Sequence, residues 1–215
     1  LVVPHTLGQT VWFEEGTGPK LDPISLTSFE KKLTLSKFFE NAAPVYQTLR
    51  LTKSQLAPSK ALIGFAGAPW TLALYMIEGE GSRDFAKAKN KAFENEAAFS
   101  TLLDTLSEVI SLHLIEQVKA GAQAVQLFDT WAGLCPATHF EKWIISPTQK
   151  IVSTLKKTFP DLPIIGFPKG IGANLITYVS QTKVSGLSLD GGTPLSWVRE
   201  NLPPPLILQG NLDPV

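Results

Sequence analysis

The sequence is poor in the side chains that bind metal ions or form covalent cross-links. Cys135 is the only cysteine among the 215 residues, which excludes an internal disulfide framework and a multi-cysteine metal site. The three histidines, at positions 5, 113 and 139, lie far apart, and their spacing matches no metal-binding motif. We therefore expect no metal site, histidines with structural hydrogen bonds, and a reducing, cytoplasmic compartment.

Charge is also scarce, and it is balanced. Lys and Arg number 19, Asp and Glu number 19, and the formal net charge is zero. Charged residues make up 18% of the chain, below the usual quarter. A protein without net charge has no long-range field that attracts nucleic acid or an anionic membrane, so we expect neither partner.

Long hydrophobic runs are absent as well. The best candidate for a membrane span, the uncharged stretch 61–77, is only about as long as the shortest spanning helix. It contains two glycines and Pro69, which favour a strand, a turn and the start of a helix instead. The chain opens on the strand-like Leu1–Val3 and closes soon after another apolar run, so we expect one domain over residues 1–215 that is cut at both ends.

What the chain does contain is a set of short, nearly continuous apolar runs, at residues 61–65, 124–128, 163–167, 184–189 and 206–209. Such runs are too short for ordinary helices and are typical of strands buried on both faces of a parallel sheet. The segments between them have helical periodicity, over residues 83–91, 99–118, 136–155, 171–180 and 193–201. Ser82 is expected to cap the first helix and Gly121 to end the second, and Pro147 is expected to kink the third or divide it into two shorter helices.

Alternating strands and helices indicate βαβ units. Without a dinucleotide-binding motif, five such units favour a barrel over a doubly wound sheet. A complete (β/α)8 barrel has about 250 residues, so we predict an α/β fold, a partial TIM barrel with about five of eight strands. The first 60 residues fit less well: residues 14–19 are expected to form a turn-rich loop, and residues 29–51 a helix interrupted by Pro44.

In a parallel barrel the functional groups lie where strands end and on the loops that follow. These positions are rich in glycine and aromatic residues and hold few charges; their polar side chains are Tyr75, Thr130, Lys169 and Asn211. A roomy, aromatic, sparsely charged site favours a large flat ligand with polar edges. Asp129 is expected to be a buried structural carboxylate bonded to loop amides, and Gly191–Gly192 a tight turn rather than a phosphate cradle.

Four blocks of sequence are distinctive, at Phe13–Pro19, Ile63–Gly79, Gly121–Gly133 and Leu208–Pro214. Together, and in this order, they resemble the uroporphyrinogen decarboxylase family of haem biosynthesis. The resemblance implies a homodimeric (β/α)8 barrel that needs no metal or organic cofactor. It also implies a tetrapyrrole substrate, uroporphyrinogen III, whose four acetate side chains lose CO₂ to give coproporphyrinogen III.

The resemblance implies further that no catalytic residue lies within this chain. The family's aspartate, which stabilises positive charge on the protonated pyrrole, and its arginine-rich segment precede Leu1, and its histidine follows Val215. We therefore expect the 215 residues alone to be inactive. The residues that carry over are substrate contacts: Tyr75, Thr130 (the family has Ser or Thr there) and Phe65.

Each contact has a structural alternative: a half-buried tyrosine, a threonine after a strand, and a core phenylalanine. Two other functions also stay open. One is a zinc-dependent methyltransferase of the same fold acting on a corrinoid or a thiol, which the single cysteine disfavours. The other is a non-catalytic paralogue that keeps the barrel and serves as a dimerisation partner.

Overall fold

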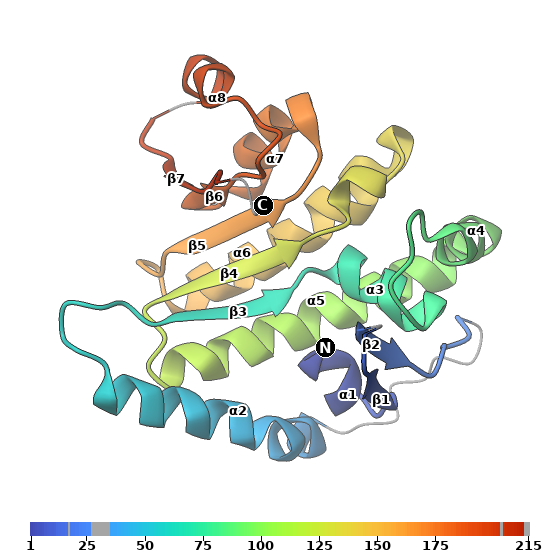
Figure 1. The fold of residues 1–215 in the computed structure, drawn as a ribbon, viewed down its shortest axis with the longest axis horizontal. Coiled ribbons are helices and arrows are strands. Elements are labelled where there is room, and N and C mark those ends of the chain that lie inside the picture. Colours follow the sequence, from blue (N-terminus) through green and yellow to red (C-terminus); the bar gives the residue numbers. More distant parts are fainter. Residues whose placement is uncertain (17, 27–34, 203, 213–215) are drawn as a thin grey trace.

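A parallel sheet organises the fold. The computed structural model describes residues 1–16, 18–26, 35–202 and 204–212. Its main sheet has five strands in the order β3-β4-β5-β6-β7, all parallel to their neighbours (Figure 1). The strands are β3 (Ile63–Gly67), β4 (Ala124–Asp129), β5 (Ile164–Pro168), β6 (Gly186–Ser188) and β7 (Ile207–Gln209). These coincide with the five predicted apolar runs, so the predicted strands are confirmed.

Helices join consecutive strands. They are α3 (Pro69–Glu78), α4 (Ala86–Glu94), α5 (Glu96–Lys119), α6 (Ser146–Thr158), α7 (Leu175–Thr182) and α8 (Leu195–Asn201). Strands that are consecutive in sequence are also neighbours in the sheet, whereas a doubly wound sheet reverses its order at a switch point. The predicted partial (β/α)8 barrel with five strands is confirmed.

The two faces of the sheet differ. Alternate side chains point to opposite faces, so residues paired in register share a face. The face toward the helices carries aliphatic residues with 0–1% exposure, namely Val125, Leu127, Ile164 and Leu187. The inner face carries Phe65, Phe128 and Phe167. Gln209 on β7 donates to Gln126 on β4 at 3.3 Å across two intervening strands, because the sheet is curved.

Helix α5 fills the layer beneath β3 and β4 (Figure 1). It is long and apolar enough to cross a membrane by length and composition, with a mean hydropathy of 1.3 over its most apolar stretch, but 61% of that stretch is buried inside the fold. Core helices of α/β folds have this character, since both the sheet and neighbouring helices cover them. The stretch 61–77, considered above as a span, forms β3 and α3, as predicted.

Two helix boundaries depart from the predicted ones. The helix after Ser82 begins at Ala86 rather than at residue 83, because the Ser82 hydroxyl accepts the Phe85 N–H and holds the preceding turn. The segment after Pro136 is a 3₁₀ turn (Ala137–His139) and a π-helix (Glu141–Ile145) before α6 starts. A kink or two shorter helices was expected at Pro147; the structure changes there from π-helix to α-helix, with Ile145 and Ser146 both helical. Gly121, with φ of +116°, follows the end of α5, as predicted.

The N-terminal segment differs most from expectation. The strand predicted at Leu1–Val3 is wrong: Val2–Thr6 form helix α1, whose buried face includes Val3 and Thr6. A spacing of three residues places both on one helical face, and the Thr6 hydroxyl donates to the carbonyls of Val2 and Val3 at 2.9 Å. Apolarity over three residues cannot distinguish a strand from a helical turn.

A small hairpin and a long helix complete this part. Strands β1 (Val11–Glu14) and β2 (Gly18–Leu21) are antiparallel, so part of the predicted loop at 14–19 is strand. Helix α2 (Leu35–Gln55) continues through Pro44, which the prediction treated as an interruption. The start of that prediction, residues 29–34, lies outside the described residues.

Candidate functional site

Two hydrogen bonds join the end of β4 to the start of α3. The Ala68 N–H donates to the Phe128 carbonyl at 2.8 Å, and the Trp70 indole N–H donates to the Trp131 carbonyl at 2.9 Å. Ala68 precedes α3, and Trp70 is its second residue. The exit of β4 and the helix that follows β3 therefore form one rigid unit, with Thr130 inside it.

Phe65 lies on the inner face of β3, with 60% of its surface exposed. Its ring packs edge-to-face on Phe128 at 5.8 Å, and Phe128 packs in the same way on Phe167 at 5.9 Å. The three rings make a row along the inner face of β3, β4 and β5. Such a row offers a large apolar surface to a flat ligand.

Phe65 also lines a cavity of about 300 Å³ between β3 and the helices α1, α2 and α5. The lining is mostly aliphatic, with His113, Gln117 and Thr48 as its polar members. Neither Tyr75 nor Thr130 lines this cavity. The structure thus brings Phe65 to a hollow that the other two predicted contacts do not share.

Tyr75 lies on α3, half-buried. Its ring packs on Phe85 at 5.6 Å, and Phe85 in turn packs on Trp131 at 5.0 Å. The hydroxyl is next to Gly81, where an added Cβ would lie 3.8 Å from it. Among the described residues the Tyr75 hydroxyl has no hydrogen-bond partner. It is therefore available to a ligand.

Thr130 immediately follows β4 and is half-buried. No described residue forms a hydrogen bond with its hydroxyl. Its two chain neighbours, Asp129 and Trp131, do make such bonds. The ring of Phe65 contacts Phe128 at the end of β4. The ring of Tyr75 contacts Phe85, which in turn contacts Trp131, just after β4. Phe65 and Tyr75 are thus connected by ring packing to the segment 128–131, in which Thr130 lies.

Asp129 is 2% exposed, and Thr71 on α3 donates a hydrogen bond to its Oδ1 at 2.6 Å. Burial raises the pKa of this carboxyl to about 7, which the hydrogen bonds from Thr71 partly oppose. A structural carboxylate was predicted here with loop amides as partners; the partners are instead the hydroxyl and the backbone amide of Thr71, on helix α3. The same hydroxyl accepts the Trp131 N–H at 3.2 Å.

The turn after β6 is built around Asp190. Its Oδ1 accepts the Gly192 N–H and the Thr193 hydroxyl, both at 3.0 Å, and its Oδ2 accepts the Gly170 N–H at 2.8 Å. The amides that could bind a phosphate are therefore occupied by a carboxylate, and the predicted tight turn is confirmed. Lys169, beside Gly170, is exposed at the end of β5.

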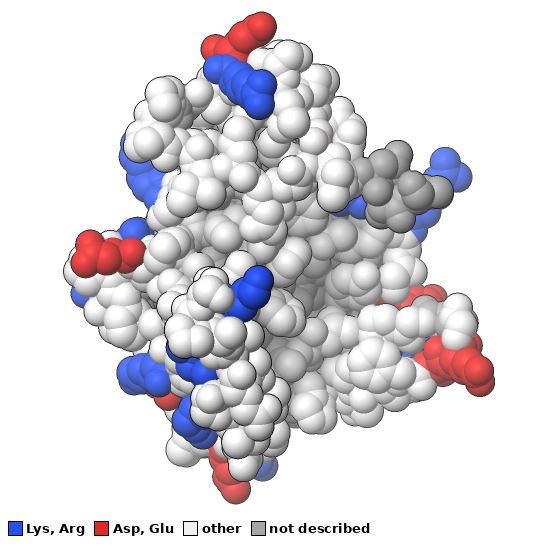
Figure 2. Space-filling view, turned by 60° about the vertical axis from the view of Figure 1, so that its left-hand side comes forward, with Lys and Arg blue, Asp and Glu red and all other residues white. Residues whose placement is uncertain are grey.

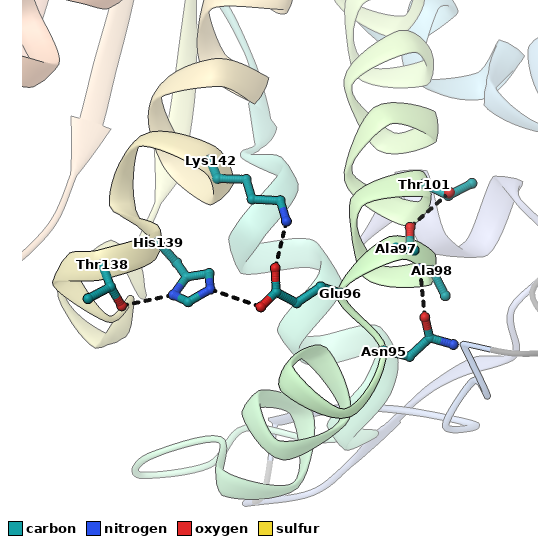
Figure 3. A network of polar contacts seen from close by, with 8 residues as sticks. All are labelled: Asn95, Glu96, Ala97, Ala98, Thr101, Thr138, His139 and Lys142. Atoms are coloured by element: carbon teal, nitrogen blue, oxygen red, sulfur yellow. Dashed lines mark hydrogen bonds and ion pairs between the residues drawn. The ribbon is translucent and has the colours of Figure 1, made fainter.

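The two histidines with described partners are structural, as predicted. His113 lies 2.9 Å from the Tyr46 hydroxyl, and burial lowers its pKa to about 4. His139 bonds to Thr138 at 2.9 Å and to Glu96 at 3.2 Å, and Glu96 also binds Lys142 at 2.7 Å (Figure 3). Among the described residues, no three His, Cys, Asp or Glu side chains lie close enough together to hold a metal ion.

Two glutamines were missed by the sequence-based prediction. The Gln117 side chain donates to the Phe65 carbonyl and accepts the Phe65 N–H, both at 2.9 Å. Gly64 makes room for it, since an added Cβ would lie 2.7 Å from its Oε1. Gln126 pairs with Gln209 on the inner face. The only sequence feature that could have indicated the role of Gln117 is Gly64, a glycine inside an apolar strand. No sequence feature indicated the role of Gln126.

Charge is dispersed over the surface. Figure 2 shows acidic and basic side chains dispersed mostly around the rim of one face, whose hollowed centre is largely uncharged apart from a Lys or Arg side chain beside it. Surface ion pairs such as Lys91–Glu94 and Lys150–Asp104 fit this pattern. Acidic and basic side chains are thus paired or dispersed rather than gathered into a patch of one sign in this view.

Comparison with known proteins gives one family. The family model described as "Uroporphyrinogen decarboxylase (URO-D)" matches residues 1–215. The chain is 43% identical over 215 residues to a curated uroporphyrinogen decarboxylase of Rhodospirillum rubrum and 45% identical to one of Mesorhizobium japonicum. All of the chain is covered in both alignments, and it spans 62% of the length of these relatives.

A solved structure gives the fold alone. A methyltransferase from Methanosarcina mazei superposes with a TM-score of 0.78 at 17% sequence identity, over 98% of this chain and 61% of the other. Its likeness supports the barrel architecture described above.

Proposed function

Since the chain belongs to the uroporphyrinogen decarboxylase family, we propose that the protein removes CO₂ from the four acetate side chains of uroporphyrinogen III and releases coproporphyrinogen III. The observation that supports this is the pairing of an aromatic row on the inner face with two unpartnered hydroxyls near the exit of β4. The row suits the apolar faces of a tetrapyrrole. The hydroxyls suit its carboxylates.

We assign the residues of this chain to binding and orientation of the substrate. Phe65 and its ring neighbours contact the macrocycle, while the hydroxyls of Tyr75 and Thr130 donate hydrogen bonds to acetate oxygens. A hydrogen bond to a charged group typically contributes about 1.5–3 kcal/mol, because the carboxylate exchanges water for a fixed donor. Fixed donors hold each acetate in the orientation in which its C–C bond can break, with the bonding electrons passing to the protonated pyrrole as CO₂ leaves.

The experiment uses the complete natural chain and uroporphyrinogen prepared by reduction and kept from oxygen and light. Products are oxidised to porphyrins and separated by their number of carboxyl groups. The proposal requires eight-carboxyl porphyrin to give way to products with seven to four. If the eight-carboxyl species stays unchanged at high enzyme concentration, the proposed function is wrong.

The methyltransferase alternative has weaker support. It shares the fold with the Methanosarcina mazei protein, but the identity of 17% carries no further argument. Zinc sites that activate thiols use cysteine thiolates, and Cys135, the chain's one cysteine, is half-buried, with its pKa raised by desolvation. A thiol held in its neutral form is a poor metal ligand.

We propose further that the protein works as a homodimer in the cytoplasm. The resemblance to the family supports the homodimer, and the single unpaired cysteine fits a reducing compartment. Sedimentation of the complete chain at several concentrations tests the first. A mass of one chain at all of them would contradict it.

A further inference from the structure

The residues around Thr130 are held on both sides by α3. Before it, the Phe128 carbonyl accepts the Ala68 N–H; after it, the Trp131 carbonyl accepts the Trp70 indole N–H. Thr130 itself takes no part. Its position is therefore set by its neighbours rather than by contacts of its own.

One hydroxyl, that of Thr71, links both neighbours of Thr130. It donates to the Asp129 Oδ1 at 2.6 Å and accepts the Trp131 N–H at 3.2 Å. A threonine hydroxyl has a single proton, so donation to Asp129 leaves a lone pair directed at the amide of Trp131. The carboxylate oxygen thus fixes the rotation of the hydroxyl, and the hydroxyl fixes the peptide that follows Thr130.

The same contact relates the two proposed ligand hydroxyls to each other. Thr71 and Tyr75 are four residues apart on α3, which places them one above the other on neighbouring turns. A shift of the Thr71–Asp129 contact therefore changes the separation of Tyr75 from Thr130. Thr71 is 6% exposed and does not itself face a ligand.

We propose that Thr71 and Asp129 are positioning residues. They fix the position of the Thr130 hydroxyl relative to Tyr75, and thereby the geometry of the hydrogen bonds to two substrate carboxylates. The inference rests on the proposed function, because it assumes that Thr130 touches the substrate. It assigns no proton transfer to either residue. Their effect on turnover passes through Thr130.

The test is a double-mutant cycle in the complete natural chain. Thr71→Val keeps the shape and removes both hydrogen bonds, Thr71→Ser keeps both, and Thr130→Val removes the dependent hydroxyl. Steady-state kcat and KM are measured per folded molecule, well below each variant's Tm. Thr182→Val is the matched control, since its hydroxyl is also buried and donates to the Tyr178 carbonyl on α7, far along the chain.

We expect Thr130→Val and Thr71→Val each to lower kcat/KM about tenfold. In the double variant the loss stays about tenfold, because the second change removes nothing that the first has left. Thr71→Ser restores activity to within about twofold of the parent, and Thr182→Val lowers Tm without lowering kcat/KM. Asp129→Leu, which removes the acceptor, behaves like Thr71→Val.

A double variant that loses about a hundredfold, the product of the single losses, would overturn the inference, as would a Thr71→Val protein with full activity per folded molecule. Those outcomes leave the proposed function intact if Thr130→Val alone is impaired. If Thr130→Val alone retains full activity, it is instead the proposed substrate contact that fails. The two failures are therefore distinguishable.

Discussion

The two faces of the parallel sheet differ in how far their side chains are exposed to water. Toward the helices, Val125 and Leu127 are 0% and 1% exposed and pack in the core. On the inner face, Phe65 is 60% exposed, and Ile207 is 59% exposed. From β3 to β6 the residues toward the helices are buried, whereas the inner face combines exposed apolar side chains with the buried Gln126.

This difference separates residues that contribute to the free energy of unfolding from residues that are free to contact a ligand. A side chain that gains nothing from burial on folding contributes little to the free energy of unfolding. Its apolar surface then remains available to a ligand. The exposed ring of Phe65 on a rigid strand is accordingly consistent with the proposed contact between this residue and the substrate.

The largest effect separates the faces directly. Leu127→Ala, on the helix side, should lower the free energy of unfolding by about 2–5 kcal/mol, because it leaves a cavity among closely packed residues. Phe65→Ala should cost less than about 1 kcal/mol while weakening tetrapyrrole binding. Denaturant unfolding and porphyrin titration of both variants check this. Equal destabilisation by the two would erase the distinction.

A smaller effect is expected from the hydroxyls at the sheet's exit. Tyr75→Phe should lower kcat/KM about tenfold to a hundredfold, since about 1.4 kcal/mol corresponds to a factor of ten. Tm should change little, because no described residue depends on this hydroxyl. Thr130→Ser should be nearly neutral, as its hydroxyl survives. A Tyr75→Phe protein that melts many degrees lower but turns over normally would make the tyrosine structural.

The next effect depends on pH. The pKa of Asp129 is about 7 in the folded state, against 3.8 in the reference state, because the carboxyl is buried. Its contribution to stability is therefore complete below pH about 4, declines as the pH rises to about 7, and is constant above that. Between these limits the slope is at most about 1.4 kcal/mol per pH unit.

Asp129→Asn removes that titration and should flatten this part of the stability profile. The measurement is the free energy of unfolding by denaturant at pH 5, 6, 7 and 8 for parent and variant. Parallel profiles would mean that Asp129 is ionised throughout, and that the burial has been offset by its hydrogen bonds.

The smallest effect is expected away from both faces, in the cluster of Glu96, His139 and Lys142 (Figure 3). These side chains are exposed enough for water to screen their attraction. Glu96→Gln should leave Tm and kcat/KM almost unchanged. A large drop in activity would place a functional site where the present structure gives none.

Local pattern was enough to predict the strands, since each apolar run of β3, β4 and β5 is continuous. It could not say which alternate residues face inward, and so it left Phe65 between core and ligand wall. Contacts distant in sequence were also inaccessible: Thr71 meets Asp129 across 58 residues, and Gln117 meets Phe65 across 52. The resemblance to a family supplied Tyr75 and Thr130, which no periodicity distinguishes.

The Gln117 side chain has a consequence for the edge of the sheet. Within the described part of the chain β3 is an edge strand, and edge strands tend to recruit strands of other molecules into aggregates. At Phe65 the amide of Gln117 already supplies the donor and the acceptor that a foreign strand would bring. Any strand that pairs with β3 at this point, whether from another molecule or from the same protein, must first displace a side chain that is 3% exposed, so this glutamine occupies the place of a neighbouring strand at Phe65.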